Sequence, residues 1–191
     1  MDSSCGFYDR AGFNLFTTSP DYCYNIMKFL MTSNEDIWKL LYYNTTDALS
    51  QPNLTMEQKR NLIYTGTGDS EPYKVFRVPF LDDAFTEQTS QLRIYLGTLL
   101  PNNRSWSLND IYFEVISHVK LSNLDNYQSR PERMLCELLS TLNGQEIGGV
   151  GRLFFDASES MYDNARANIF NNRNFFGYTL IMSVRNGDII E

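Results

Sequence analysis

The amino-acid sequence predicts an α+β fold, and three observations lead to this prediction. Two runs of alternating apolar and polar residues, QLRIYLGTLL and DIYFEVISHVK, are typical of half-buried strands. The amphipathic segment SRPERMLCELLSTLNG follows them and predicts a helix. Two further strand-like runs, VGRLFF and FGYTLIMSV, complete a strand–strand–helix–strand–strand order between Gln91 and Arg185.

Length and composition fit one domain. The chain has 191 residues and a hydrophobic fraction of 42%, which is ample for a core. We expect an N-terminal arm over residues 1–18 and a single α+β domain over residues 19–191. Within that domain, residues 19–70 form a helical N-terminal part and residues 73–185 form the sheet-and-helix core.

The helical N-terminal part contains three helix-start signals. They are Ser19 before Pro20, and two pairs with the spacing of a capping box, Thr32 with Glu35 and Thr55 with Gln58. Residues 73–78 then alternate in polarity and predict a strand that Pro79 ends.

The helix of the core has a clear start and stop. Ser129 and Glu132 have the spacing of a capping box, and Asn143-Gly144 is typical of a helix end. Its apolar stripe consists of Met134, Leu135, Leu138, Leu139 and Leu142, and we expect this stripe to pack against the sheet. Cys136 lies beside the stripe and is expected to be a buried thiol.

Three connections of the core are longer than ordinary turns. Residues 97–109 predict either a projecting loop or a long β-arm. Residues 156–174 predict a polar, Asn-rich loop with one helical turn around residues 162–167. The Gly-rich residues 144–152 lack the Lys-Ser/Thr pair of a phosphate-binding loop, so we interpret them as a flexible helix-to-strand connection.

The net charge of the chain indicates whether it binds nucleic acid, and the length of its apolar runs indicates whether it can cross a membrane. A net charge of −7 argues against a surface that grips phosphate, although it is compatible with a protein that surrounds DNA without holding it. No run reaches the ~20 apolar residues that cross a bilayer. The N-terminus lacks the basic start and apolar run of a signal peptide, so we expect the chain to fold in a cytoplasm.

Residues suited to chemistry are few. Asp82, Asp83 and Glu87 lie close in sequence but lack the spacing of a calcium loop, so we interpret them as a solvated acidic loop. The single histidine, His118, has no recognisable nucleophile beside it and is expected to be partly exposed. We therefore expect no catalytic residue, metal site or cofactor.

The order of these elements resembles the tail-terminator and tail-completion proteins of long-tailed bacteriophages. It is also similar to ring-forming neck proteins, including those of crAss-like phages. The similarity is strongest in LRIYL, in IYFEVISHVKLSNLDN, in SRPERMLCELLSTLNG followed by GVGRLFFD, and in GYTLIMSV. The preceding segment EDIWKLLYYNTTDAL also resembles the N-terminal helical part of these proteins. This resemblance implies a mixed, mainly antiparallel sheet with helices on one face. It also implies a closed ring of six or twelve copies between portal and tail, through which DNA passes without specific binding.

The long connections are expected to contact other subunits, because ordering a long loop costs entropy that docking can offset. The candidate contacts to a neighbouring copy, or to portal, adaptor or tail proteins, are Arg104, Trp106, Tyr162, Phe170 and Phe175. Two alternatives remain open at this point. One is a small-ligand or regulatory binding module with an apolar pocket, and the other, weaker one is a metal-assisted nuclease that uses the residues Asp82, Asp83 and Glu87.

Overall fold

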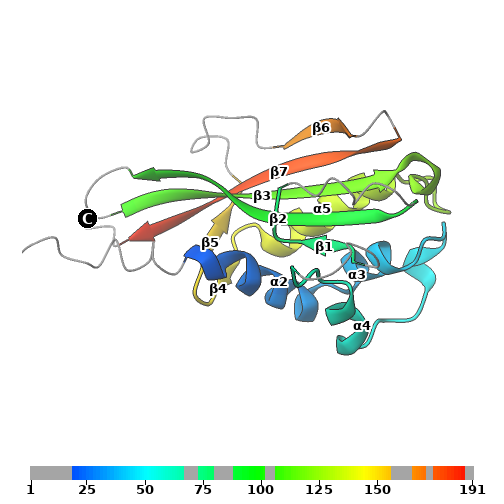
Figure 1. Ribbon diagram of the computed structural model, residues 1–191, viewed down its shortest axis with the longest axis horizontal. Helices are drawn as coiled ribbons and strands as arrows, with labels where there is room; N and C mark the ends of the chain where they lie inside the picture. The colour runs from blue at the N-terminus through cyan, green and yellow to red at the C-terminus, as the bar shows by residue number, and fades with distance from the viewer. Residues whose placement is uncertain are drawn as a thin grey trace, which may run out of the picture.

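The computed structural model describes residues 19–66, 73–79, 88–101, 106–155, 165–170 and 174–187. A long, curled sheet lies on one side of the molecule, and the helices pack together on the other side (Figure 1). The predicted α+β class is confirmed, with a mixed, mainly antiparallel sheet and helices on one face.

The helices fall into an N-terminal group and one later helix. The N-terminal group consists of the 3-10 turn η1 (Ser19–Asp21), α2 (Tyr22–Ser33), α3 (Glu35–Tyr42), the 3-10 turn η2 (Ala48–Ser50) and α4 (Met56–Asn61). The later elements are the 3-10 turn η4 (Val119–Leu121) and α5 (Arg130–Leu142).

The capping predictions had different outcomes. The box at Thr55 and Gln58 is confirmed at the start of α4, where both reciprocal hydrogen bonds form. The box at Thr32 and Glu35 is wrong, because α2 continues through Ser33 and Asn34 caps α3 instead by accepting from the Ile37 N–H at 2.9 Å. Thr32 donates backward to the Phe29 carbonyl at 2.9 Å.

Seven strands form the sheet in the order β1-β2-β3-β7-β5-β4, and β6 also pairs with β7. Their bounds are β1 (Val75–Phe76), β2 (Ser90–Pro101), β3 (Trp106–His118), β4 (Glu146–Ile147), β5 (Gly151–Phe154), β6 (Ala165–Phe170) and β7 (Phe175–Gly187). Only the β1–β2 pair is parallel among these strands.

The longest strands, β2, β3 and β7, form the centre of the sheet. β3 pairs with β7 along its whole length, from Trp106 opposite Gly187 to His118 opposite Phe175. The other edge of β7 is shared, because β6 pairs with its first half and β5 with its second half. β2 has an irregular register against β3 between Leu96 and Leu99, which is typical of a bulge.

One hydrophobic core joins the helices to the sheet. Alternate residues of the strands point toward the helices, as the period of two requires. On β3 these residues are Ile111, Phe113 and Val115, and on β7 they are Leu180, Met182 and Val184. The residues 19–62 contribute to the same core through α2 and α3, so the helical N-terminal part and the sheet belong to one packed unit.

Helix α5 packs as its stripe predicts. Met134, Leu138 and Leu142 are buried, while Leu135 and Leu139 are partly buried against the same core. The capping box at its start is wrong, because the Ser129 hydroxyl makes no cap hydrogen bond. The buried-thiol prediction for Cys136 is also wrong, since this thiol lies on the exposed side of the helix.

Two segments that were interpreted as connections contain strands. Residues 165–170 form β6, so the described end of the Asn-rich segment is extended and not helical. The Gly-rich segment folds as the β4–β5 hairpin, with positive φ at Gly144, Gly149 and Gly151. No described helix is long and apolar enough to span a membrane.

Candidate subunit-contact surfaces

The three central strands extend beyond the helices as a β-arm. β2 runs to Pro101 and β3 begins at Trp106, with Leu100 opposite Leu108 and Pro101 opposite Ser107. β7 accompanies them to Gly187 (Figure 1). Of the two predictions for residues 97–109, the long β-arm is therefore confirmed in the part that the structure describes.

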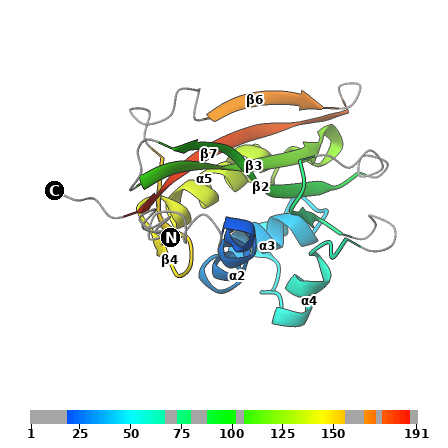
Figure 2. The ribbon, with the colours of Figure 1, turned by 60° about the vertical axis from the view of Figure 1, so that its left-hand side comes forward.

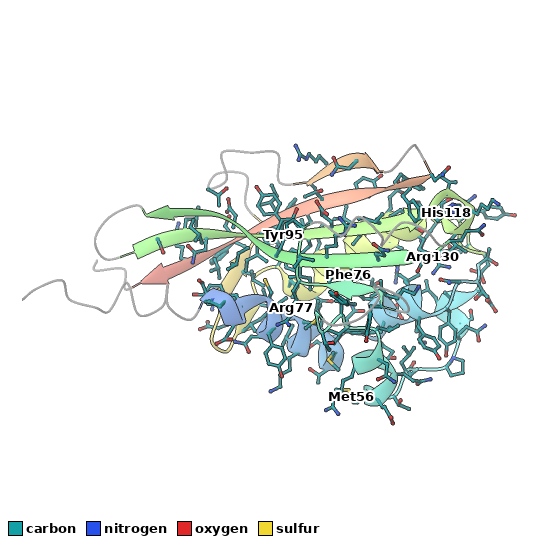
Figure 3. All side chains as sticks on the ribbon, in the orientation of Figure 1. Met56, Phe76, Arg77, Tyr95, His118 and Arg130 are labelled. Carbon is teal, nitrogen blue, oxygen red and sulfur yellow. The ribbon has the colours of Figure 1, made fainter. Side chains whose placement is uncertain are left out.

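A close packing contact lies where this arm begins. A Cβ atom added to Gly97 would lie 1.8 Å from Tyr112 Cε2, so the Tyr112 ring covers the backbone of β2 where glycine leaves room. The Tyr112 ring also stacks on the Tyr95 ring, with centroids 5.4 Å apart. These two rings form an aromatic platform (Tyr95 and Tyr112) that covers the β2 backbone at Gly97. Figure 3 shows Tyr95 on the central strands.

A polar cluster lies next to this platform on the sheet face away from the helices. The Tyr95 hydroxyl donates to Glu114 Oε1 at 2.8 Å, and Arg93 Nη1 lies 3.6 Å from Glu114 Oε2. Arg93 is only 3% exposed and also donates to the Pro79 carbonyl at 2.9 Å. Burial, together with the hydrogen bond to Glu114, raises the pKa of Tyr95, so its hydroxyl stays protonated.

Arg93 and Glu114 of the polar cluster form a largely buried ion pair. Burial lowers the pKa of Arg93, and the adjacent Glu114 raises it. Farther along the same face, Ser183 donates to Asp110 at 2.7 Å and both side chains are buried. Nowhere in the described part of the chain do three or more metal-ligating side chains gather in a way that could hold a metal ion.

β6 differs from every other long strand because its side chains contribute little to the core. Ala165, Arg166 and Ala167 are exposed, although β6 pairs with β7 without a register shift from Ala165 opposite Leu180 to Phe170 opposite Phe175. Figure 2 shows β6 at the margin of the sheet away from α2 and α4. Its backbone pairs with β7, and the Asn168 amide also donates to the Thr179 hydroxyl of β7.

Two longer stretches of strand edge have no described strand beside them, in addition to the outer edge of the two-residue end strand β4. β1 covers β2 only at Leu92 and Arg93, so the outer edge of β2 from Ile94 onward has no described strand beside it. The Cys23 side chain lies close to the Leu96 backbone, so Gly97–Pro101 is the part of this edge that no described neighbour covers. The outer edge of β6 is the second of these stretches among the strands that the structure describes.

The predicted contact residues that the structure describes, Trp106, Phe170 and Phe175, lie at two opposite ends of β7. Arg104 and Tyr162 lie outside the described residues, as do Asp82, Asp83 and Glu87. Trp106 begins β3 opposite Gly187, at the end of the arm. Phe170 ends β6 at the opposite end of β7, where it pairs with Phe175.

Phe175 is buried on the sheet face away from the helices. It is only 2% exposed, and its ring meets the His118 ring edge-on at 4.9 Å, so it is hidden within the subunit from a neighbour. His118 is half-buried, as predicted, and its Nδ1 accepts from the Lys120 N–H at 3.1 Å. Burial, and then Lys120, lower the pKa of His118.

Arg130 is the structural residue that the sequence did not indicate. It is 0% exposed. Its guanidinium donates to carbonyls at the C-terminal end of α3 and the loop after it, and to the Leu121 carbonyl of η4. Figure 3 labels its side chain on the ribbon. The acceptors are Leu40 at 2.7 Å, Tyr43 and Leu121 at 2.9 Å, and Thr45. Its position directly after Ser129 looks like an ordinary exposed first helical turn, so no sequence signal identifies it.

The comparisons with known proteins identify a family. A family model described as YomW matches residues 34–184, which include α3, α4, α5 and most of the sheet, and the chain belongs to this family. No curated protein and no solved structure matches the chain.

Proposed function

We propose that this protein is a structural subunit of a phage head-to-tail connector. In this proposal, copies assemble into a homo-oligomeric ring of six or twelve around the DNA channel, in the neck of the virion. The ring joins the portal or adaptor above it to the tail below it, and it performs no catalysis. The observation that carries the proposal is the β-arm of β2, β3 and β7, which extends beyond the helices.

An arm of this kind favours assembly for an energetic reason. Its strands gain backbone hydrogen bonds but lie past the helical layer, so fewer apolar contacts offset the entropy of ordering them. A partner that packs against the arm supplies the missing contacts. In a cyclic ring each copy presents one surface and receives its neighbour on a different surface, which suits a subunit with an arm at one end.

The charge of the chain supports the DNA-channel part of the proposal. The net charge is −7, and a surface that attracts phosphate would slow DNA that must pass through the ring. We therefore propose that acidic side chains outnumber basic ones on the wall of the channel.

The mass of the assembled particle tests this function directly. Native mass spectrometry of the purified protein, alone and with virion neck fractions, should give a closed species of six or twelve copies. A protein that remains a monomer or dimer at all concentrations, and is absent from virions, would favour the small-ligand binding module instead.

A shortened arm provides the second test. Leu100 and Leu108 are register partners, so replacing residues 101–107 with Asn-Gly closes the hairpin by a two-residue turn. The circular dichroism spectrum should stay that of the folded subunit, while the ring species should be lost. A shortened variant that still assembles fully would remove the arm from the proposal.

A further inference from the structure

We infer that neighbouring copies join by sheet extension, with the open edge of β6 in one copy pairing with the Gly97–Pro101 stretch of β2 in the next. This inference rests on the proposed ring and names its contact. It concerns these two open stretches of strand edge, whereas the proposed function rests on the length of the arm.

The state of β6 within one subunit is the first argument. The side chains of Ala165, Arg166 and Ala167 are exposed and gain little hydrophobic stabilisation, yet Ala165–Phe170 keeps a continuous register with β7. The strand contains no proline and its pairing with β7 includes no bulge, so its outer backbone edge is suited to pair with another strand.

The requirement for closure selects the second edge. Pairing β6 with β6 of another copy gives a two-fold dimer and stops there, whereas a ring needs two different surfaces. Within the described residues, the end strand β4 has only two residues, whereas the open stretch Gly97–Pro101 of β2 is close in length to β6. This stretch includes the register shift against β3 between Leu96 and Leu99 and ends at Pro101.

Side-chain chemistry on the outer face is the third argument. Arg166 is opposite Thr179, which is opposite Glu114, so Arg166 projects to the sheet face that carries Glu114 and the aromatic platform. Arg166 has no ion pair in the described part of the subunit. In a sheet continued from β2 to a neighbouring β6, Arg166 would reach the Tyr112 ring over Gly97, with Glu114 behind it.

The pairing therefore matches a cation with an aromatic ring and a carboxylate. Arginine over a tyrosine face is favourable, and a nearby carboxylate adds attraction. The small side chains Ala165 and Ala167 leave space on the other face for the larger side chains of β2. Both faces of the added strand thus have complementary partners.

Disulfide trapping between copies tests this contact. Adjacent strands lie about 4.8 Å apart, which is within the Cα–Cα range of a disulfide. In a background with Cys5→Ser and Cys136→Ser, Thr98→Cys is combined in turn with Ala165→Cys, Arg166→Cys, Ala167→Cys and Asn168→Cys. Mild oxidation should give a ladder of covalent oligomers up to the ring for at least one combination, on a non-reducing gel.

The controls separate this inference from the proposed function. Thr98→Cys with Ser140→Cys, on the exposed side of α5, should give no ladder. Covalent dimers from a β6 cysteine alone would establish a β6–β6 contact and overturn the β2 assignment. A ring by native mass spectrometry without any ladder would refute sheet extension and leave the proposed function intact, whereas single copies throughout would refute both.

A charge reversal gives an independent readout on the same contact. Arg166→Glu should raise the subunit concentration needed for half-assembly by about tenfold or more, because it replaces an attraction to Tyr112 and Glu114 by a repulsion. Arg152→Glu, at another exposed arginine of the sheet, should change it much less. Equal effects of the two variants would show that net charge, and not this contact, controls assembly.

Discussion

Replacing Arg130 should destabilise the subunit more than replacing any exposed arginine. Its guanidinium bonds to four backbone carbonyls, three of which belong to the end of α3 and the loop after it. Arg130→Met keeps much of the side-chain volume but leaves these buried carbonyls without their donor.

The magnitude follows from two opposing contributions. Hydrogen bonds to a charged group contribute ~1.5–3 kcal/mol each, but burying a guanidinium costs several kcal/mol in desolvation. The variant regains the desolvation energy of the guanidinium but leaves four backbone carbonyls without their donor, so we expect a net loss of about 3–5 kcal/mol. Arg130→Lys should lose less, because its ammonium group can still donate to some of the carbonyls.

Urea unfolding followed by circular dichroism measures this loss. The matched control is Arg152→Met, since Arg152 is exposed and lies 3.5 Å from the equally exposed Glu146; it should cost less than about 0.5 kcal/mol. Burial lowers the pKa of Arg130 to about 10, so the guanidinium is charged in both folded and unfolded chains at neutral pH. The loss should thus be the same from pH 6 to 9, and a value below about 1 kcal/mol would refute the bonding argument.

Three further outcomes are expected of the isolated subunit. Leu138→Ala should cost about 2–5 kcal/mol in urea unfolding, because this side chain is 0% exposed, and the half-buried Leu139 should cost less. In a Cys5→Ser background, Cys136 should react rapidly with a thiol reagent, whereas Cys23, which burial gives a pKa of about 11, should react only on unfolding. The pKa of His118 in the folded chain lies below its usual value, so protonation of this imidazole favours the unfolded chain. The free energy of unfolding should therefore fall as the pH drops below about 6.5. His118→Gln should make the free energy of unfolding less dependent on pH in this range.

The strands and helices that sequence patterns predicted well are those with a buried face. The alternation in β2, β3 and β7 and the stripe of α5 both arise from contact with one core, and the structure confirms them. β6 was missed for the same reason, since a strand with exposed side chains needs no apolar alternation. Its sequence, ARANIF, begins with residues that read equally well as a polar loop.

Local motifs predicted helix starts less well than helix faces. The capping-box spacing occurs at three places, but both bonds of the box form only at Thr55. At Ser129, the adjacent Arg130 instead binds carbonyls of residues far away in the sequence. Such a contact depends on how α3 packs against α5, and the spacing of residues along the chain does not predict this packing.

Polar contacts hold the helices of the subunit to one another, whereas the outer edges of β2 and β6 have stretches with no described strand beside them. This difference bears on assembly. Asn34 donates to Glu137 and Thr141 of α5, and Lys59 donates to Glu35 and the Met31 carbonyl, so polar contacts fix α2, α3, α4 and α5 to one another. On β6, the side-chain hydrogen bond from Asn168 to Thr179 links the strand to β7, and no described strand lies along its other edge. Helices α2 and α3 pack against β2, and β6 is held through its pairing with β7. Because rigid elements lose little entropy on binding, the free energy gained by pairing these two edges is not spent on ordering the helices. A subunit built in this way is suited to assemble through its edges without changing its core.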